Sequence, residues 1–147
     1  MAAVDKVTTK DGRTYYIERL TDPAVILSLL EPKRAYAAYA ICQLEPERFP
    51  YTRWYLAKGD AGEALVMHSL GSLESNLWGY GAGLFCMGDP AALDALLSLH
   101  PGPRFVQAKA QMEHLTVLKR HFRLRSEEPV MLHLRTIANV RPVEGPV

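Results

Sequence analysis

The stretch YTRWYLAKGDAGEALVMHSL, residues 51–70, decides the fold class of this 147-residue chain. It contains two β-type runs, Tyr51–Lys58 and Ala64–Leu70, which carry most of the apolar residues of the stretch. Between them, Gly59-Asp60-Ala61-Gly62 forms a four-residue loop with the glycines that a hairpin turn requires. The stretch therefore predicts two adjacent antiparallel strands joined as a hairpin.

One more strand and two short helices are predicted on the N-terminal side of this hairpin. Thr14–Leu20 is a β run that places Tyr15 and Ile17 on one face. Asp22-Pro23 is a helix start, because aspartate caps free N–H groups and proline is tolerated at the first helical position. A second apolar stripe at helical spacing, residues 36–44, predicts another short helix.

Strands and helices alternate on the C-terminal side of the hairpin. Tyr80–Met87 predicts a strand, which Gly88-Asp89-Pro90 ends while it begins a helix. Further along the chain we predict strands over Arg104–Gln107, Phe122–Arg125 and Val130–Ile137 and a helix from Met112 to Arg120. The fold class is therefore α/β of the α+β type. Residues 1–138 form one domain, and residues 139–147, rich in proline and glycine, read as a linker-like tail.

Charge and hydropathy exclude two classes of partner. Lys and Arg total 17 against 16 Asp and Glu, so the chain has no excess of positive charge to bind a phosphate backbone. The strongly apolar stretches are too short to span a bilayer, and residues 1–13 are polar, unlike a signal peptide. We therefore expect a cytoplasmic protein that binds neither nucleic acid nor membrane.

The histidines and cysteines give no clear catalytic or metal-binding pattern. No two histidines have the three- or four-residue spacing that places two metal ligands on one helical face, so no metal site is expected. We interpret His114 and His121 as partly exposed surface residues. Cys42 and Cys86 are interpreted as reduced, structural thiols in apolar surroundings.

Two functional alternatives involve the same region. Cys86 could act as a nucleophile if His68, on a preceding strand, lay beside it and raised its thiolate fraction. Aromatic residues near the sheet could line a substrate pocket formed by Trp54, Tyr80 and Cys86.

Several segments resemble the N-terminal half of bacterial two-domain proteins of the GNAT family of N-acetyltransferases. These segments are Asp22-Pro23, Tyr36-Ala37-Ala38-Tyr39-Ala40, Phe85-Cys86-Met87-Gly88-Asp89-Pro90, and His121-Phe122-Arg123-Leu124 with Pro129-Val130-Met131. The order of predicted elements is also similar to the GNAT fold across nearly the whole chain. The resemblance implies a GNAT-like mixed, mostly antiparallel central sheet flanked by about four helices. The resemblance implies that a C-terminal copy carries the usual acetyl-CoA site, and the tail lies where the connection to it would begin.

The chain departs from the GNAT pattern at the site of the cofactor. Active members follow the fourth strand with a Gln/Arg-x-x-Gly-x-Gly/Ala loop, whose N–H groups hold the pyrophosphate. At this position the chain has Gly88, Asp89 and Pro90: proline lacks an N–H donor, and the aspartate would occupy the capping donors and repel phosphate. Active members also tend to use a late tyrosine as general acid, and no tyrosine follows Tyr80. No catalytic residue can therefore be carried over, and no cofactor is expected.

Three functions follow as hypotheses. In the first, the chain is a GNAT-like domain without an acetyl-CoA site, a scaffold or substrate-positioning partner of a second GNAT domain in cis or of a second copy. In the second, it is a divergent acetyl-CoA-dependent N-acetyltransferase acting on a small amine, with the backbone N–H groups of Phe85–Met87 polarising the thioester carbonyl. The third is a small-ligand binding module that uses an aromatic cleft around Trp54 and Tyr80.

Overall fold

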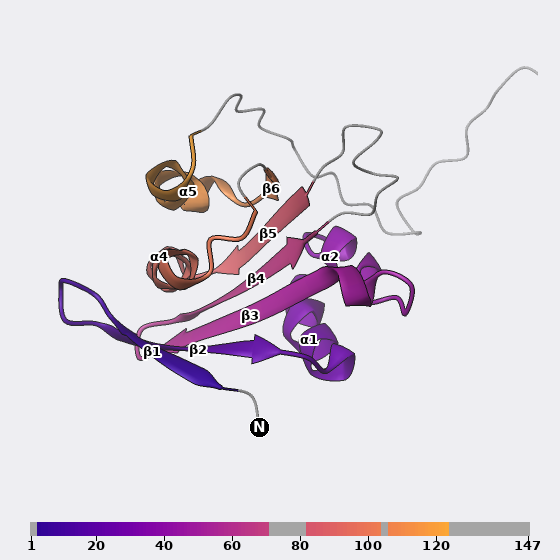
Figure 1. Ribbon diagram of the computed structural model, residues 1–147, viewed down its shortest axis with the longest axis horizontal. Helices are drawn as coiled ribbons and strands as arrows, with labels where there is room; N and C mark the ends of the chain where they lie inside the picture. The colour runs from indigo at the N-terminus through magenta and orange to yellow at the C-terminus, as the bar shows by residue number, and fades with distance from the viewer. Residues whose placement is uncertain (1–2, 71–81, 104–105, 124–147) are drawn as a thin grey trace, which may run out of the picture.

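The computed structural model describes residues 3–70, 82–103 and 106–123, which form a single six-stranded sheet with helices on both faces (Figure 1). The strands lie in chain order: β1 (Val4–Thr8), β2 (Thr14–Leu20), β3 (Thr52–Gly59), β4 (Glu63–Ser69), β5 (Ala82–Gly88) and β6 (Val106–Lys109). Every neighbouring pair is antiparallel except β5 and β6, which are parallel. The predicted mixed, mostly antiparallel sheet is confirmed.

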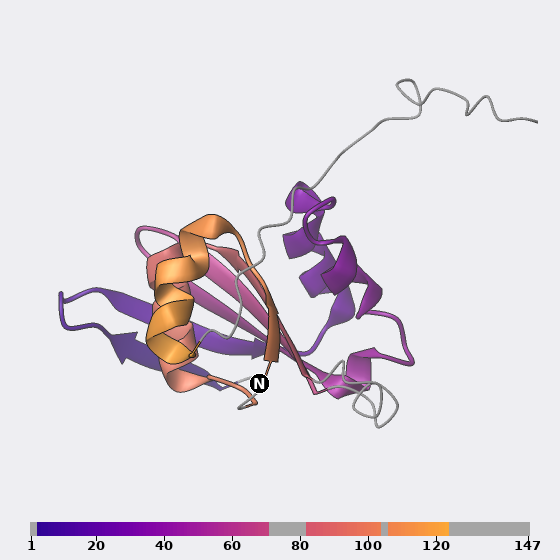
Figure 2. The ribbon, with the colours of Figure 1, turned by 90° about the horizontal axis from the view of Figure 1, so that it is seen from above.

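Four α-helices in the described part of the chain cover the two faces of the sheet, as predicted. They are α1 (Pro23–Leu30), α2 (Ala38–Cys42), α4 (Pro90–Leu99) and α5 (Leu115–His121), with short 3₁₀ helices η1 (Glu31–Lys33), η2 (Phe49–Tyr51) and η3 (Met112–His114). Figure 2 shows α1 and α2 on one side of the sheet and α4 and α5 on the other. A parallel pair requires a crossover connection, and α4 provides it between β5 and β6.

Each face of the sheet has its own hydrophobic core, because successive strand residues point to opposite faces. Leu84 and Cys86 of β5 belong to the core under α4 and α5. Phe85 of the same strand belongs to the core under α1 and α2, with Trp54 and Met67. Consecutive residues of β5 therefore pack into different hydrophobic cores.

The central hairpin forms as its sequence predicts. The N–H of Gly59 donates to the carbonyl of Gly62 at 3.0 Å, and Lys58 stands opposite Glu63 in the register of β3 and β4. The two aspartate caps also form. Asp22 accepts a hydrogen bond from the N–H of Ala24 at the start of α1, with Pro23 in the first helical position.

Three elements differ from the predictions. Strand β1 was not expected: its only apolar residues are Val4 and Val7, and it is an exposed edge strand that pairs with β2. The stripe at residues 36–44 forms a shorter helix, α2. The strand predicted at Arg104–Gln107 occurs at Val106–Lys109, and residues 104–105 lie outside the described residues.

Other predicted elements lie wholly or mostly outside the described residues. The strand predicted at Phe122–Arg125 has only its first two residues described: Phe122 follows the end of α5 and donates its N–H to the carbonyl of Leu118. The Val130–Ile137 strand and the tail at residues 139–147 are entirely outside.

A carboxylate on α4 holds α5 in place. Asp94 lies 2.9 Å from a guanidinium nitrogen of Arg120 and 2.6 Å from Nε2 of His121. Both residues are in the last turn of α5, where the positive charge of Arg120 also interacts favourably with the helix dipole. This contact joins α5 to α4 beside the core that the two helices share.

We predict that Gly88→Ala lowers the free energy of unfolding by more than about 2 kcal/mol, measured by urea denaturation. Gly88 has a φ of +106°, and a Cβ there would lie 2.3 Å from the backbone oxygen of Glu63. Gly12→Ala is the matched control, because Gly12 also has a positive φ, +84°, but a Cβ there meets nothing within 4 Å. Its expected cost is about 1 kcal/mol. Equal costs for both variants would contradict the steric argument.

Candidate functional site

The turn from β5 into α4 is the place where the GNAT resemblance locates a phosphate loop. The Asp89 carboxylate accepts a hydrogen bond from the N–H of Ala92 at 3.0 Å, and the N–H of Asp89 itself donates to the carbonyl of Glu63 at 2.8 Å. Pro90 occupies the first helical position and has no N–H. Of the donors at this helix start, only the N–H of Ala91 is left for a ligand within the described residues.

A buried histidine completes this turn. Nε2 of His114 lies 2.8 Å from the carbonyl oxygen of Gly88, and Nδ1 accepts the N–H of Gln111 at 3.1 Å. These bonds define the tautomer: Nε2 carries the hydrogen and donates it to Gly88. His114 has no exposed surface, so its interpretation as a surface residue is wrong. The imidazole joins the turn before α4 to the turn before α5.

The spacing of Gln111 and His114 was the sequence signal for this role. At the start of η3 only one half of a capping box forms: the His114 side chain accepts the N–H of Gln111, and the N–H of His114 donates to the backbone carbonyl of Gln111 at 2.9 Å. The side-chain oxygen of Gln111 has no hydrogen-bond partner within the described residues. A polar residue followed three positions later by another hydrogen-bonding residue is the pattern of such a box. Histidine is not the usual residue at the third position, so the pattern was missed.

A tyrosine covers the point where β5 and β6 stop pairing. The last residues in register are Phe85 and Lys109. Just beyond them the Tyr36 hydroxyl donates to the carbonyl of Cys86 at 2.6 Å, and it lies 3.4 Å from the carbonyl of Lys109. The Tyr36 ring packs on Phe85 with centroids 5.3 Å apart, and Nζ of Lys109 lies 5.6 Å from its centroid. Burial raises the pKa of the Tyr36 phenol, so it remains a hydrogen-bond donor.

Cys86 is placed as a structural thiol. It is fully buried among apolar side chains, and burial raises its pKa to about 12. His68 stands opposite Leu84 and not opposite Cys86, and its Nε2 interacts with the carbonyl of His100 at 2.9 Å. Within the part of the chain that the structure describes, His68 therefore does not serve as the base that a nucleophilic thiol would need. Cys42 differs from the prediction, because it is exposed on α2.

The proposed aromatic pocket is not assembled in the described residues. Trp54 is 1% exposed and faces α1 and α2, whereas Cys86 faces α4 and α5. The indole N–H of Trp54 donates to the hydroxyl of Thr52 at 2.8 Å, so its polar atom is satisfied in the core. Tyr80 lies outside the described residues. Trp54 and Cys86 therefore cannot line one cleft, because the sheet separates them.

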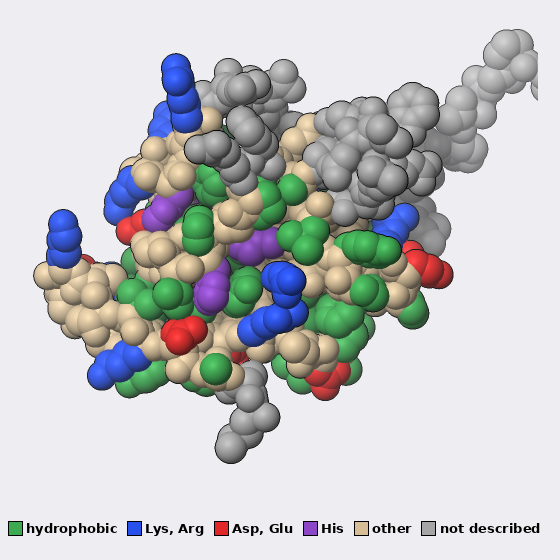
Figure 3. All heavy atoms as spheres, viewed as in Figure 1, with side chains coloured by type: hydrophobic (Ala, Val, Ile, Leu, Met, Phe, Trp, Pro, Cys, Tyr) green, Lys and Arg blue, Asp and Glu red, His purple; other side chains and the backbone are tan. Residues whose placement is uncertain are grey.

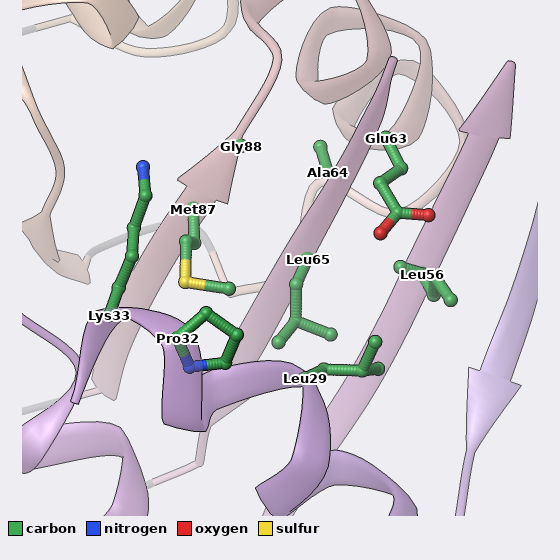
Figure 4. Close-up of a pocket in the computed structure, with 9 residues that line it drawn as sticks. All are labelled: Leu29, Pro32, Lys33, Leu56, Glu63, Ala64, Leu65, Met87 and Gly88. Carbon is green, nitrogen blue, oxygen red and sulfur yellow. The ribbon is translucent and has the colours of Figure 1, made fainter. Parts of the chain in front are cut away.

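A different pocket opens beside the turn, on the face covered by α1. It has a volume of about 210 Å³, and Figure 4 shows it between η1 and the strands β3, β4 and β5. Its apolar lining comes mainly from Leu29, Leu56, Leu65 and Met87. Charged side chains stand on opposite sides of this lining: Lys33, from η1, and Glu63, from the start of β4. Lys33 and Glu63 are 30 positions apart in sequence, so no local sequence pattern could predict that both line one pocket.

Two further histidines lie on the opposite face of the sheet. The rings of Tyr55 and His100 stack with centroids 4.0 Å apart, and Nε2 of His100 is 4.0 Å from the carboxylate of Asp5. His68 lies beneath them and is 2% exposed, with Nδ1 lacking a hydrogen-bond partner. Figure 3 shows histidine side chains at the surface near basic ones on one side of the molecule. Nδ1 of His68 faces Gly102, where an added Cβ would lie 2.4 Å away, and so has no room for a ligand.

Neither a metal cluster nor a membrane span is found in the described residues. No group of three His, Cys, Asp or Glu side chains among them is arranged to hold a metal ion. Within residues 3–70, 82–103 and 106–123, no helix combines the length and the apolarity needed to cross a lipid bilayer.

Comparison with known proteins adds no assignment. No protein-family model, curated protein or solved structure matches the chain. The site must therefore be interpreted from its own geometry.

We predict that His114→Phe lowers the free energy of unfolding by about 2–4 kcal/mol. The phenyl ring keeps most of the volume but leaves the Gly88 carbonyl and the Gln111 N–H without partners, and each such buried group costs about 1–3 kcal/mol. The measurement is urea denaturation, with Met112→Leu as the control, because Met112 is 72% exposed in the same 3₁₀ helix. A loss no larger than that of the control would rule out the two hydrogen bonds as a structural link.

We also predict that the protein loses stability as the pH falls below about 6.5. Burial is the main cause that lowers the pKa of His68, with a smaller opposing effect from its bond to the His100 carbonyl, and burial also lowers the pKa of His100. The unfolded chain, with ordinary histidine pKa values, therefore binds protons first on acidification, and protonation favours unfolding.

The test is the unfolding free energy measured at about pH 7.5 and about pH 5.5. His68→Gln is the informative variant, because its amide can donate to the His100 carbonyl but does not titrate in this range. Its stability should depend less steeply on pH. An equal slope in both proteins would show that His68 does not carry the effect.

Proposed function

We propose that the chain is a GNAT-like domain without an acetyl-CoA site of its own, which acts as a scaffold or substrate-positioning partner of an N-acetyltransferase. The order of its elements supports the resemblance: a strand, two short helices, three antiparallel strands, a helix, a parallel strand and another helix follow one another from β2 to α5. The partner is a second GNAT domain in cis or a second copy of this chain. A cytoplasmic location remains a prediction.

The observation that carries the proposal is the closed turn at Asp89. A phosphate group bound at a helix start needs several free N–H groups and the positive end of the helix dipole. Here a carboxylate already accepts one N–H, the carbonyl of Glu63 accepts a second, and Pro90 provides none. A bound pyrophosphate would also lie against the Asp89 carboxylate, which repels it.

The alternative, a divergent N-acetyltransferase, has less support from the geometry. Phe85 and Met87 stand opposite Met67 and Leu65 of β4 in the sheet, so their backbone groups face a neighbouring strand. On the other side, the Tyr36 hydroxyl covers the carbonyl of Cys86. A thioester carbonyl would have to displace these contacts to reach the N–H groups of Phe85–Met87.

The third hypothesis, a binding module built on Trp54 and Tyr80, is also weakened. Trp54 is 1% exposed, and its indole lies in the core with Met67 and Phe85. A ligand could stack on this ring only after repacking of the α1 and α2 face.

Isothermal titration calorimetry with acetyl-CoA, and with free CoA in parallel, tests the missing cofactor site. We expect no saturable heat from the folded protein, because only one N–H is left at the helix start. Saturable binding of both ligands by the unmodified chain would overturn the proposal and favour the acetyltransferase.

A double variant, Asp89→Ser with Pro90→Ala, tests whether the Asp89 carboxylate and the missing N–H of Pro90 prevent the binding of CoA. Serine keeps a capping oxygen without the charge, and alanine restores an N–H. We expect this variant to bind CoA more tightly than the unmodified chain, and thermal melting serves as the control for its folding. Sedimentation of the unmodified protein then distinguishes the two kinds of partner, since a dimer indicates a second copy.

A further inference from the structure

The pocket beside η1 combines an apolar floor with two unused charges. Leu56 and Leu65 of the floor are 4% and 2% exposed, and Met87 and Leu29 are half-buried. Within the described residues, the Lys33 ammonium and the Glu63 carboxylate have no hydrogen bond or ion pair. By contrast, the neighbouring Glu31 and Arg34 form an ion pair with each other.

The positions of the two charges restrict the kind of ligand that fits. Figure 4 shows Lys33 on one side of the apolar lining, beside Pro32 and Met87, and Glu63 on the other, above Leu56. A ligand that meets both must therefore carry its own charges at opposite ends of an apolar body. An α-amino acid holds its ammonium and carboxylate on one carbon and matches this arrangement poorly.

The size of the pocket also favours a small ligand. Its volume of about 210 Å³ is below the range of about 300–1,000 Å³ that is typical of sites for drug-sized molecules. Burial of several methylene groups against Leu56, Leu65 and Met87 would contribute most of the affinity, and the charged ends would determine specificity.

We infer that this pocket binds a small aliphatic zwitterion whose carboxylate meets Lys33 and whose ammonium meets Glu63. The inference is independent of the proposed partner role, because it concerns the side-chain pocket on the α1 face and not the donors of the α4 N-terminus. A ligand site here would lie directly beside Gly88, at the end of β5.

Lys58 is a neighbouring charge whose effect on ligand affinity must be distinguished from the effects of Lys33 and Glu63. It stands opposite Glu63 in the register of β3 and β4 and is exposed, but it is not within ion-pair distance of that carboxylate. If Glu63 pairs with the ligand ammonium, Lys58 repels that ammonium. Removal of Lys58 should then leave the affinity unchanged or raise it.

The probe for the test is 5-aminopentanoate, titrated into protein with isotope-labelled methionine methyl groups and followed by nuclear magnetic resonance. We expect a saturable shift of the Met87 methyl signal, identified through its loss in Met87→Leu. Pentanoate and pentylamine, which each lack one charge, and leucine, whose charges are adjacent, should each bind about two- to fivefold more weakly.

Variants of the two rim residues separate the charges. Lys33→Met should weaken 5-aminopentanoate by about two- to fivefold while it leaves pentylamine unaffected or improved. Glu63→Gln should weaken the binding of 5-aminopentanoate by a similar factor and leave the binding of pentanoate unaffected or improved. Lys58→Met is the matched control on the exposed surface, and all three variants should melt like the parent protein.

Three results would overturn the inference. The first is that no signal shifts saturably up to the solubility limit of the probe. The second is that other methionine signals shift saturably while the Met87 methyl signal does not. The third is that the Met87 signal shifts, but neither Lys33→Met nor Glu63→Gln changes the affinity. The acetyl-CoA titration has its own readout, so either proposal can fail without the other.

Discussion

The turn through Gly88 and Asp89 is the constraint on which the rest of the structure depends. At this point the chain leaves an antiparallel strand and must cross to a parallel one. Three polar groups at the turn each engage a different element: β4 accepts the Asp89 N–H, α4 receives the Asp89 carboxylate as a cap, and His114 donates to the Gly88 carbonyl. A left-handed backbone at Gly88 brings these partners within reach. The same bonds that orient α4 also remove the donors that an anion would use.

Local signals in the sequence predicted the parts of the fold that depend on adjacent residues. Asp22 and Asp89 are caps because their carboxylates reach N–H groups two or three residues away. The Gly59 and Gly62 hairpin closes through a bond within its own loop. Strand β1 was missed because an exposed edge strand needs few apolar residues, and its pairing partner β2 supplies the evidence for it only in three dimensions.

The candidate site was less predictable, since it depends on which face each side chain occupies. Trp54 and Cys86 both lie on predicted strands, but the register of three strands decides that they lie on opposite faces of the sheet. The burial of His114 likewise depends on a carbonyl 26 residues away. The periodicity of hydrophobic residues along the chain does not show which face of the sheet a residue occupies or which distant residue it contacts. The sequence could therefore suggest these residues as candidates but could not predict their positions.

The agreement between spatial order and chain order in the sheet has a consequence for how the protein folds. Each of the first five strands pairs with the next described strand along the chain, and α1 and α2 lie between β2 and β3. Contacts between strands that are close in sequence require little loop closure, which favours rapid folding. During synthesis, each strand can add to the growing edge as it leaves the ribosome. The parallel pairing of β6 is the exception, because it has to wait until α4 has formed and packed across the sheet.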